Sequence, residues 1–235
     1  MRRRIAAVLI VLAAGALAWG AVVFVRGAER RLATVPALVA AALARGGEPL
    51  VALSHIAPGL PEATVAIEDR SFWRNPGISL EGVGRAALVD VANQAWVEGG
   101  STITQQLMRD ELLGEQKTLH RKLIEMAYAV LATQRFSKAT ILTLYLNEVD
   151  YGAGAFGIAA AAHTYFSTTP ATLTLVQSVL LAGLPQNPAG LDPLAHPEAA
   201  LERRTQVVAA MVATHRISPA QGRALDAQPL GLRPA

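Results

Sequence analysis

The feature that most constrains this chain is an uncharged apolar run near its N-terminus. Residues 5–25 carry no charged side chain and consist mainly of Ala, Val, Leu and Ile. At about 1.5 Å per residue, a helix over these positions spans roughly 30 Å, the thickness of a bilayer core. The run therefore predicts one membrane-spanning helix, and the rest of the chain is expected to fold beside a membrane.

The charges on either side of this run indicate its orientation. Residues 2–4 are all arginine, whereas residues 26–31 contain three arginines and Glu29. The positive-inside rule weakly favours a cytoplasmic N-terminus and a translocated body. A cleavable signal peptide is the alternative, because Ala16-Leu17-Ala18 has the small-x-small pattern of a cleavage site. The run is longer than a usual signal core, so we expect a retained single-pass anchor in the inner (cytoplasmic) membrane, with the body on the extracytoplasmic face.

Positive charge is concentrated beside the apolar run. The first 31 residues hold six of the 21 Lys and Arg residues and one of the 18 Asp and Glu residues, which leaves 15 basic and 17 acidic residues beyond them. This distribution argues against a nucleic-acid-binding face. The chain has no cysteine, so a disulfide framework and a thiolate metal site are both excluded.

Helical periodicity dominates the sequence after residue 61. Serines are placed to cap three helices, at Ser79, at Ser137 and at Ser218, where Pro219 follows in the first turn. Further apolar helical patterns cover residues 119–131, 172–182 and 197–217. A strand pattern is suggested only at residues 50–53. We expect a mainly α fold, in which residues 1–31 form the cytoplasmic tip, the anchor and its basic flank, residues 32–61 a tether, and residues 62–235 one domain.

A glycine-rich segment at residues 152–157 matches the dinucleotide fingerprint G-x-G-x-x-G. That fingerprint should follow a strand and should be followed by an acidic residue about 20 positions later. Here a helical pattern precedes the glycines, and the next acidic residue is Asp192. We therefore interpret the segment as a glycine turn between two helices.

The segment with the most evident binding chemistry is Gly-Gly-Ser-Thr-Ile-Thr-Gln-Gln at residues 99–106. Glycines allow the backbone to approach a ligand closely, and uncharged hydroxyls and amides suit sugar hydroxyls and phosphate oxygens. Glu68 lies upstream at the end of an apolar run, where burial can favour a general base. Glu125 lies downstream, four residues after Arg121 on the same helical face.

Each of these features also has an ordinary structural explanation. Glu68 can be a surface carboxylate paired with Arg70, and Glu125 can form a common i,i+4 ion pair with Arg121. The hydroxyls of the polar segment can cap the helix that the pattern predicts after them. Taken singly, none of these features establishes a function.

Together and in this order, the segments resemble the motifs of the family 51 peptidoglycan glycosyltransferases. The resemblance runs from about residue 53 to the C-terminus and includes the N-terminal anchor. The five matching segments are residues 66–72, 99–106, 121–125, 137–157 and 181–188. The resemblance implies a monofunctional transglycosylase or the glycosyltransferase domain of a class A penicillin-binding protein. The implied fold is a lysozyme-like, two-lobed, mainly α domain with one N-terminal transmembrane helix.

The activity implied by this resemblance is the polymerisation of lipid II into glycan strands, with release of undecaprenyl pyrophosphate. Glu68 would be the general base, and Glu125 would support the leaving pyrophosphate, alone or as a ligand of a divalent cation such as Mg²⁺ or Mn²⁺. The expected partners are lipid II, the growing glycan strand, the membrane and cell-wall synthesis proteins, with no nucleic acid. The residues implied to bind substrate are Asp69, Arg70, Phe72, Gly100, Ser101, Thr102, Thr104, Gln105, Gln106, Arg109, Lys117, Arg121, Lys122 and Asn147.

The sequence departs from the family pattern at four places. Asn75 stands where the family usually has histidine, and Arg109-Asp110 stands where it usually has Lys-Asn. Thr133 and Ala159 stand where glutamates are common. Two further functions therefore remain open. The chain could be an inactive family member that acts as a membrane-bound cell-wall scaffold, or a lysozyme-like hydrolase, since paired carboxylates also serve glycosidases.

Overall fold

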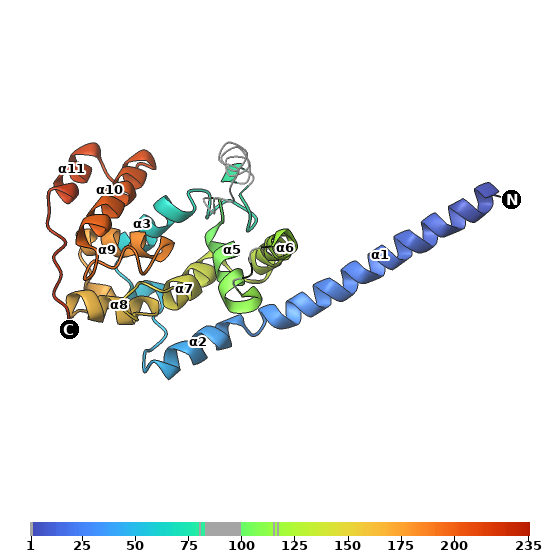
Figure 1. Cartoon of the computed structure of the whole chain (residues 1–235), viewed down its shortest axis with the longest axis horizontal. Coiled ribbons are helices and arrows are strands. Elements are labelled where there is room, and N and C mark those ends of the chain that lie inside the picture. Colours follow the sequence, from blue (N-terminus) through green and yellow to red (C-terminus); the bar gives the residue numbers. More distant parts are fainter. Residues whose placement is uncertain (1, 80, 83–99, 115, 117) are drawn as a thin grey trace.

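The computed structural model describes residues 2–79, 81–82, 100–114, 116 and 118–235 (Figure 1). Over these residues the chain is mainly helical and contains no strand beyond one isolated bridge between Asp150 and Phe156. This confirms the predicted mainly α fold with one N-terminal apolar helix. One long helix, α1 (Arg2–Leu32), extends away from a body that holds the other helices (Figure 1).

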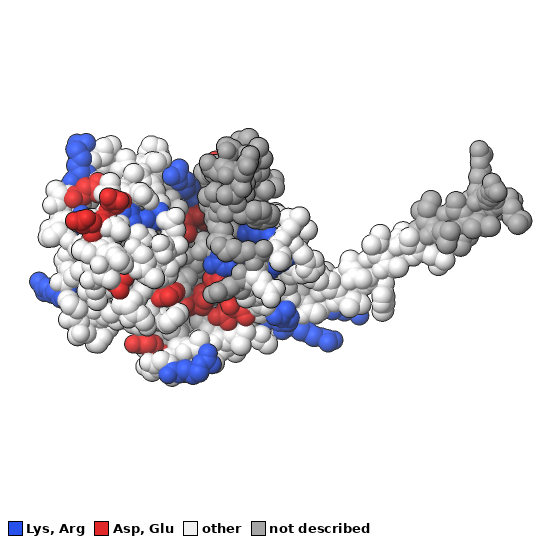
Figure 2. Space-filling view, viewed as in Figure 1, with Lys and Arg blue, Asp and Glu red and all other residues white. Residues whose placement is uncertain are grey.

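α1 is long and apolar enough to cross a membrane, and its described side chains are almost all exposed. In Figure 2 the described part of α1 is uncharged until it approaches the body, where basic side chains gather. Its C-terminal end contacts the body directly. The ring of Phe24 meets the ring of Tyr128 edge-on at 6.0 Å, and the guanidinium of Arg31 donates to the backbone carbonyl of Leu112. The predicted anchor helix is therefore joined to the fold by side-chain contacts.

The segment predicted as a tether packs onto the body. It contains α2 (Val35–Arg45), which buries Val35, Val39 and Leu43, three residues at helical spacing on one face, against α7 (Lys138–Glu148). After α2 the chain has no strand at the predicted position. Instead, the side-chain amide of Asn147 bonds both backbone groups of Val51, at 2.8 and 2.9 Å, and a 3-10 turn follows at Leu53–His55.

Three helices form one side of the body: α3 (Gly59–Glu68), α9 (Leu175–Gly183) and α10 (Pro197–Ala213) all contact one another. Their close approach depends on small residues, because a Cβ at Gly59 would lie 2.8 Å from Cδ1 of Leu175. α9 begins later than its apolar pattern suggested, since Thr174 caps it and a 3-10 turn occupies Pro170–Thr172. α11 (Pro219–Asp226) begins at the predicted Ser218 cap and packs on α10.

The other side of the body is built around α5 (Ile103–Met108), which continues into a π-helical turn at Arg109–Leu113. α5 contacts both α6 (Leu119–Arg135) and α7. α6 confirms the predicted helix, but its expected apolar stripe is not its buried face. Leu119 and Leu123 are 62% and 58% exposed, whereas the helix buries Glu125, Tyr128, Ala129 and Ala132. α6 therefore turns a carboxylate toward α5.

The glycine-rich segment forms the predicted turn, between α7 and α8 (Gly157–Phe166). Gly152, Gly154 and Gly157 all have positive φ. A Cβ at Gly157 would lie 2.5 Å from the carbonyl oxygen of Asn147, so only glycine fits there. The segment follows a helix, which is not the context that a dinucleotide site needs.

Ser79 accepts a hydrogen bond at 3.0 Å from the backbone N–H of Gly82, as a helix cap does. The remainder of the helix predicted there, at residue 80 and from residue 83 onward, lies outside the described residues.

Candidate active site

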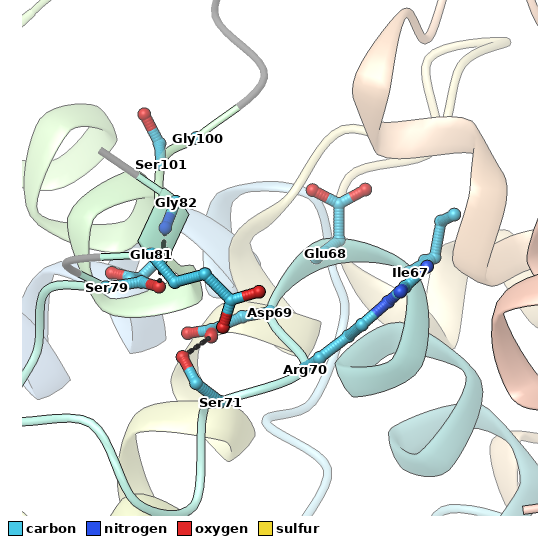
Figure 3. A pocket seen from close by; sticks show the side chains of 11 residues that line it. Ile67, Glu68, Asp69, Arg70, Ser71, Ser79, Glu81, Gly82, Gly100 and Ser101 are labelled. Atoms are coloured by element: carbon cyan, nitrogen blue, oxygen red, sulfur yellow. Dashed lines mark hydrogen bonds between the residues drawn. The ribbon is translucent and has the colours of Figure 1, made fainter. Parts of the chain in front are cut away.

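Glu68 is the last residue of α3, and the helix carries its carboxylate to the edge of a pocket (Figure 3). Both carboxylate oxygens accept hydrogen bonds. Nε2 of Gln106 donates to Oε2 at 2.9 Å, and Nη2 of Arg203 donates to Oε1 at 3.3 Å. The hydroxyl of Tyr145 donates in turn to Oε1 of Gln106 at 3.1 Å. An amide and a guanidinium therefore hold the Glu68 carboxylate from two sides at the edge of the pocket.

Glu125 is held in a different way. Its side chain is 1% exposed. Nη1 of Arg121 donates to Oε2 at 2.8 Å, and Nζ of Lys122 and Nε2 of Gln105 donate to Oε1. Lys122 also donates to Oγ of Ser101 at 2.6 Å. Glu125 is thus a buried anion that holds two cations in place beside the polar segment.

Two neighbouring glutamines connect these carboxylates to the same helix. Successive residues of a helix point about 100° apart, so Gln105 faces Glu125 on α6 while Gln106 faces Glu68 on α3. A capping box fixes this helix at its start. Oγ1 of Thr102 accepts from the backbone N–H of Gln105, and Oε1 of Gln105 accepts from the N–H of Thr102.

The loop that follows Glu68 is fixed by Asn75. Its Nδ2 donates to both carboxylate oxygens of Asp69, at 3.0 and 2.9 Å, and its Oδ1 accepts from Nζ of Lys138 at 2.9 Å. Burial raises the pKa of the Asp69 carboxyl, although its hydrogen bonds to Asn75 and Ser71 oppose this shift. Burial also lowers the pKa of the Lys138 ammonium, although the nearby charge of Asp69 opposes this shift. An uncharged amide, at a position where the resemblance implies histidine, therefore joins the buried Asp69 carboxyl to the half-buried Lys138 ammonium.

Several residues predicted to bind substrate line one polar pocket of about 230 Å³ (Figure 3). Its walls come from the end of α3 and the following loop, from the Ser79 cap and from the start of the polar segment. The lining residues are Ile67, Glu68, Asp69, Arg70, Ser71, Ser79, Glu81, Gly82, Gly100, Ser101 and Thr102. Hydroxyls, carboxylates and one guanidinium in a hollow of this size suit a sugar-sized polar ligand.

Other predicted binding residues lie inside the fold. Phe72 and Thr104 have no exposed surface and Asn147 is 1% exposed, so direct substrate contact by these side chains is incompatible with their burial. Phe72 packs under Lys138, whose Nζ lies 4.7 Å from the ring centroid, and Asn147 holds the chain at Val51. Arg109 pairs with Asp110, its Nη2 donating to Oδ2 at 3.0 Å. Lys117 lies outside the described residues.

Sequence reasoning missed two residues of this site, Tyr145 and Arg203. Tyr145 lies within the fourth family-like segment, but a buried aromatic residue on a helix is ordinarily core. Arg203 left a clearer signal. It lies three residues after Ala200 and four before Val207, so it is a charged residue on the apolar face of an amphipathic helix.

The residues around Glu125 do not fit the suggested divalent cation. Hard cations such as Mg²⁺ prefer several oxygen ligands, whereas the donors at this carboxylate are two cations and an amide. No group of three His, Cys, Asp or Glu residues that could hold a metal occurs in the described part of the chain. We therefore assign no chemistry here to a bound metal.

The fold and the site together define a class of protein: a helical domain joined to an apolar N-terminal helix, with one carboxylate at the edge of a polar pocket and a second, buried carboxylate that binds two cations. Comparisons with known proteins give the family. The family model described as Transglycosylase matches residues 38–212. This chain therefore belongs to the transglycosylase family, the family 51 peptidoglycan glycosyltransferases, and the resemblance seen in its motifs is confirmed.

Two relatives are penicillin-binding proteins. Penicillin-binding protein 1A of Aquifex aeolicus is 42% identical over 171 residues, which are 73% of this chain and 24% of that protein. Penicillin-binding protein 2D of Bacillus subtilis is 39% identical over 184 residues, 78% of this chain and 27% of that protein. The chain thus spans about a quarter of the length of these relatives.

One relative matches along nearly its whole length. A protein of Cupriavidus necator that carries a provisional transglycosylase name is 36% identical over 225 residues, which are 96% of both chains. A crystal structure of penicillin-binding protein 1A from Haemophilus influenzae matches 43% of this chain and 15% of that chain, with 36% identity and a TM-score of 0.40. Because that match covers less than half of the chain, the family assignment depends on the sequence comparisons.

Proposed function

We propose that this chain polymerises lipid II into glycan strands and releases undecaprenyl pyrophosphate. The observation that carries the proposal is the difference between the two carboxylates beside the polar segment. Glu68 borders the pocket with donors on both oxygens, and Glu125 is buried beneath Arg121 and Lys122. One carboxylate can accept a proton, and the other organises cations for phosphate.

In this proposal Glu68 removes the proton from the 4-hydroxyl of the acceptor sugar. The hydroxyl oxygen then forms a bond to the anomeric carbon of the donor, and the bond from that carbon to the pyrophosphate oxygen breaks. The proton stays on Glu68, and the electron pair leaves with the pyrophosphate. Both oxygens of Glu68 already accept hydrogen bonds from Gln106 and Arg203, a geometry that suits a carboxylate base, whereas a lysozyme-like hydrolase needs a protonated acid.

Arg121 and Lys122 are the groups that we expect to meet the departing charge. An ammonium has three N–H donors, and the described residues use two of those of Lys122, through Ser101 and Glu125. The third donor can bind a phosphate oxygen while Glu125 keeps the cation in place. Cations fixed before the reaction stabilise developing negative charge without reorganisation.

The test is an assay of the purified full chain in detergent with labelled lipid II. Long glycan products would support the proposal, and Glu68→Gln should abolish them. Unchanged lipid II across a range of detergents and metal ions would instead indicate the inactive scaffold. Shortening of preformed glycan without polymerisation would indicate the hydrolase.

We further propose that α1 holds the chain in the cytoplasmic membrane with the body on the extracytoplasmic face, where cell-wall synthesis proteins could meet it. The proposal is supported by the apolar length of α1 and by its exposed side chains. The chain has no cysteine, so a single exposed cysteine at Ala224→Cys on α11 reports the location of the body. A membrane-impermeant thiol reagent should label it in cells whose cytoplasmic membrane is intact, and protection until lysis would contradict the orientation.

A further inference from the structure

Arg203 on α10 makes three separate contacts although its side chain is only 10% exposed. Nε donates to the carbonyl oxygen of Gly183 at 3.1 Å, and Nη1 donates to Oε1 of Gln206 at 2.9 Å. Nη2 donates to Oε1 of Glu68 at 3.3 Å. Two contacts therefore fix the guanidinium independently of Glu68, and the third directs one N–H toward the proposed base.

The place of Arg203 also depends on Gly183. A Cβ at Gly183 would lie 2.8 Å from Cγ of Arg203 and 3.2 Å from Cγ2 of Val207. The missing side chain thus leaves space for the arginine, and the glycine carbonyl accepts its hydrogen bond. The fifth family-like segment, which contributes no residue to the pocket lining, acquires a role in this way.

A purely structural ion pair would be expected to have a different geometry. Arginine binds a carboxylate most strongly with two parallel N–H···O bonds, but only one N–H of Arg203 contacts Glu68. The other oxygen of Glu68 is bound by Gln106. Arg203 and Gln106 therefore hold the carboxylate from two sides, and each oxygen keeps a lone pair for a further partner.

We propose that Arg203 is a positioning residue for the general base: its guanidinium fixes the direction of the Glu68 carboxylate and places a positive charge beside it. This inference rests on the proposed role of Glu68. A positive charge at this distance favours the ionised form of a carboxylate by about one pH unit or more. Removing the Arg203 guanidinium should therefore shift the reaction to higher pH, and it should not remove a contact to the substrate.

The experiment compares pH profiles of kcat/KM for lipid II polymerisation by the full chain and by Arg203→Gln. The acidic limb of the profile should move upward by about one pH unit, while KM at alkaline pH stays within about twofold. Arg203→Lys keeps the charge and should return the limb toward its original position. Arg223→Gln removes a cation from an exposed position on α11 and should leave the profile unchanged.

Gly183→Ala is the second variant, because it leaves every charge in the sequence and its Cβ would meet the side chain of Arg203 most closely, with Val207 next. It should move the limb in the same direction, and it decides the question if Arg203→Gln does not fold. A rise in KM at every pH, with the limb in its original place, would show that Arg203 binds substrate or supports the fold only, and the proposal would be wrong.

A direct titration separates this proposal from the proposed function. The Glu68 carboxyl can be followed by ¹³C NMR in the resting protein, and it should titrate at higher pH in Arg203→Gln than in the unchanged chain. If the chain does not polymerise lipid II, the proposed function fails and this titration still decides the effect of Arg203 on Glu68. If the chain polymerises and the titration does not move, only the role of Arg203 fails.

Discussion

The surroundings of Glu68 and Glu125 differ in how far they satisfy the two carboxylates. Glu68 is 12% exposed at the end of a short helix and receives one amide and one guanidinium bond. Glu125 is 1% exposed in the middle of a long helix and receives bonds from two cations and an amide. Glu68 keeps access to the pocket, whereas Glu125 is saturated by the protein. This difference is the basis of the roles proposed for the two glutamates, Glu68 in proton transfer and Glu125 in the placement of positive charge.

The largest expected effect tests the first side of this comparison. Glu68→Gln keeps the shape of the side chain and removes the proton acceptor, so polymerisation of lipid II should fall by roughly 10²–10⁴-fold. The melting temperature should change little, because the carboxylate lies at the pocket edge. Glu202→Gln, at an exposed position on α10, is the matched control for activity. Retained polymerisation in Glu68→Gln would mean that another residue is the base.

The second prediction concerns Glu125. Glu125→Gln leaves Arg121 and Lys122 without their buried counter-charge, so we expect a destabilisation of about 2–3 kcal/mol, or a melting temperature lower by roughly 4–10 °C. Polymerisation should fall by about 10- to 100-fold, since the cations lose their fixed positions. Thermal unfolding in one detergent, beside the lipid II assay, measures both effects. If Glu68→Gln destabilised the chain more than Glu125→Gln, the contrast between the two carboxylates would be wrong.

The two glutamines provide a sharper version of the same contrast. Gln106→Leu removes a donor from Glu68 and should lower kcat by about tenfold, and the loss of the acceptor of the Tyr145 hydroxyl should cost about 1 kcal/mol of stability. Gln105→Leu removes both a bond to Glu125 and half of the capping box of α5, which should cost about 1–2 kcal/mol of stability. The polymerisation rate should therefore fall more in Gln106→Leu, and the melting temperature should fall more in Gln105→Leu. Equal responses would contradict the division of roles between Gln105 and Gln106.

The smallest expected effect on activity comes from a third carboxyl group, Glu148 at the end of α7. Burial raises the pKa of Glu148 to about 9, and the nearby charges of Asp110 and Glu111 add to this effect, against Arg109. From about pH 4.5 to about pH 9 the folded chain then binds one proton more than the unfolded chain, so stability falls as the pH rises through this window.

Glu148→Gln should remove this dependence. Compared with the unchanged chain, the variant should gain about 1–3 kcal/mol at pH 9 and much less at pH 5, with polymerisation almost unchanged. Melting temperatures at pH 5, 7 and 9 measure the difference, and Glu202→Gln again serves as the control. If the melting temperatures of Glu148→Gln and of the unchanged chain differed by the same amount at all three pH values, Glu148 would be ionised in the folded state.

Much of the local structure followed from the sequence. Ser137 and Ser218 cap the helices that they were expected to cap, and the glycines at residues 152–157 form the expected turn. These features depend on neighbouring residues, because a cap or a positive φ is decided within a few positions. The predictions failed where burial decides the outcome. The exposed Leu119 and Leu123 and the buried Phe72 could not be distinguished by local pattern.

The sequence by itself determined the family, the helical class, the apolar N-terminal helix and the two glutamates beside the polar segment, because these are carried by composition and by motifs in a fixed order. Only the tertiary structure decided which side chain holds which carboxylate. The contact between Arg203 and Glu68 joins residues that are 135 positions apart. Gln105 and Gln106 reach different carboxylates only because Glu125 on α6 and Glu68 on α3 lie on different sides of α5. Partners of this kind are set by the packing of helices, which no local pattern encodes.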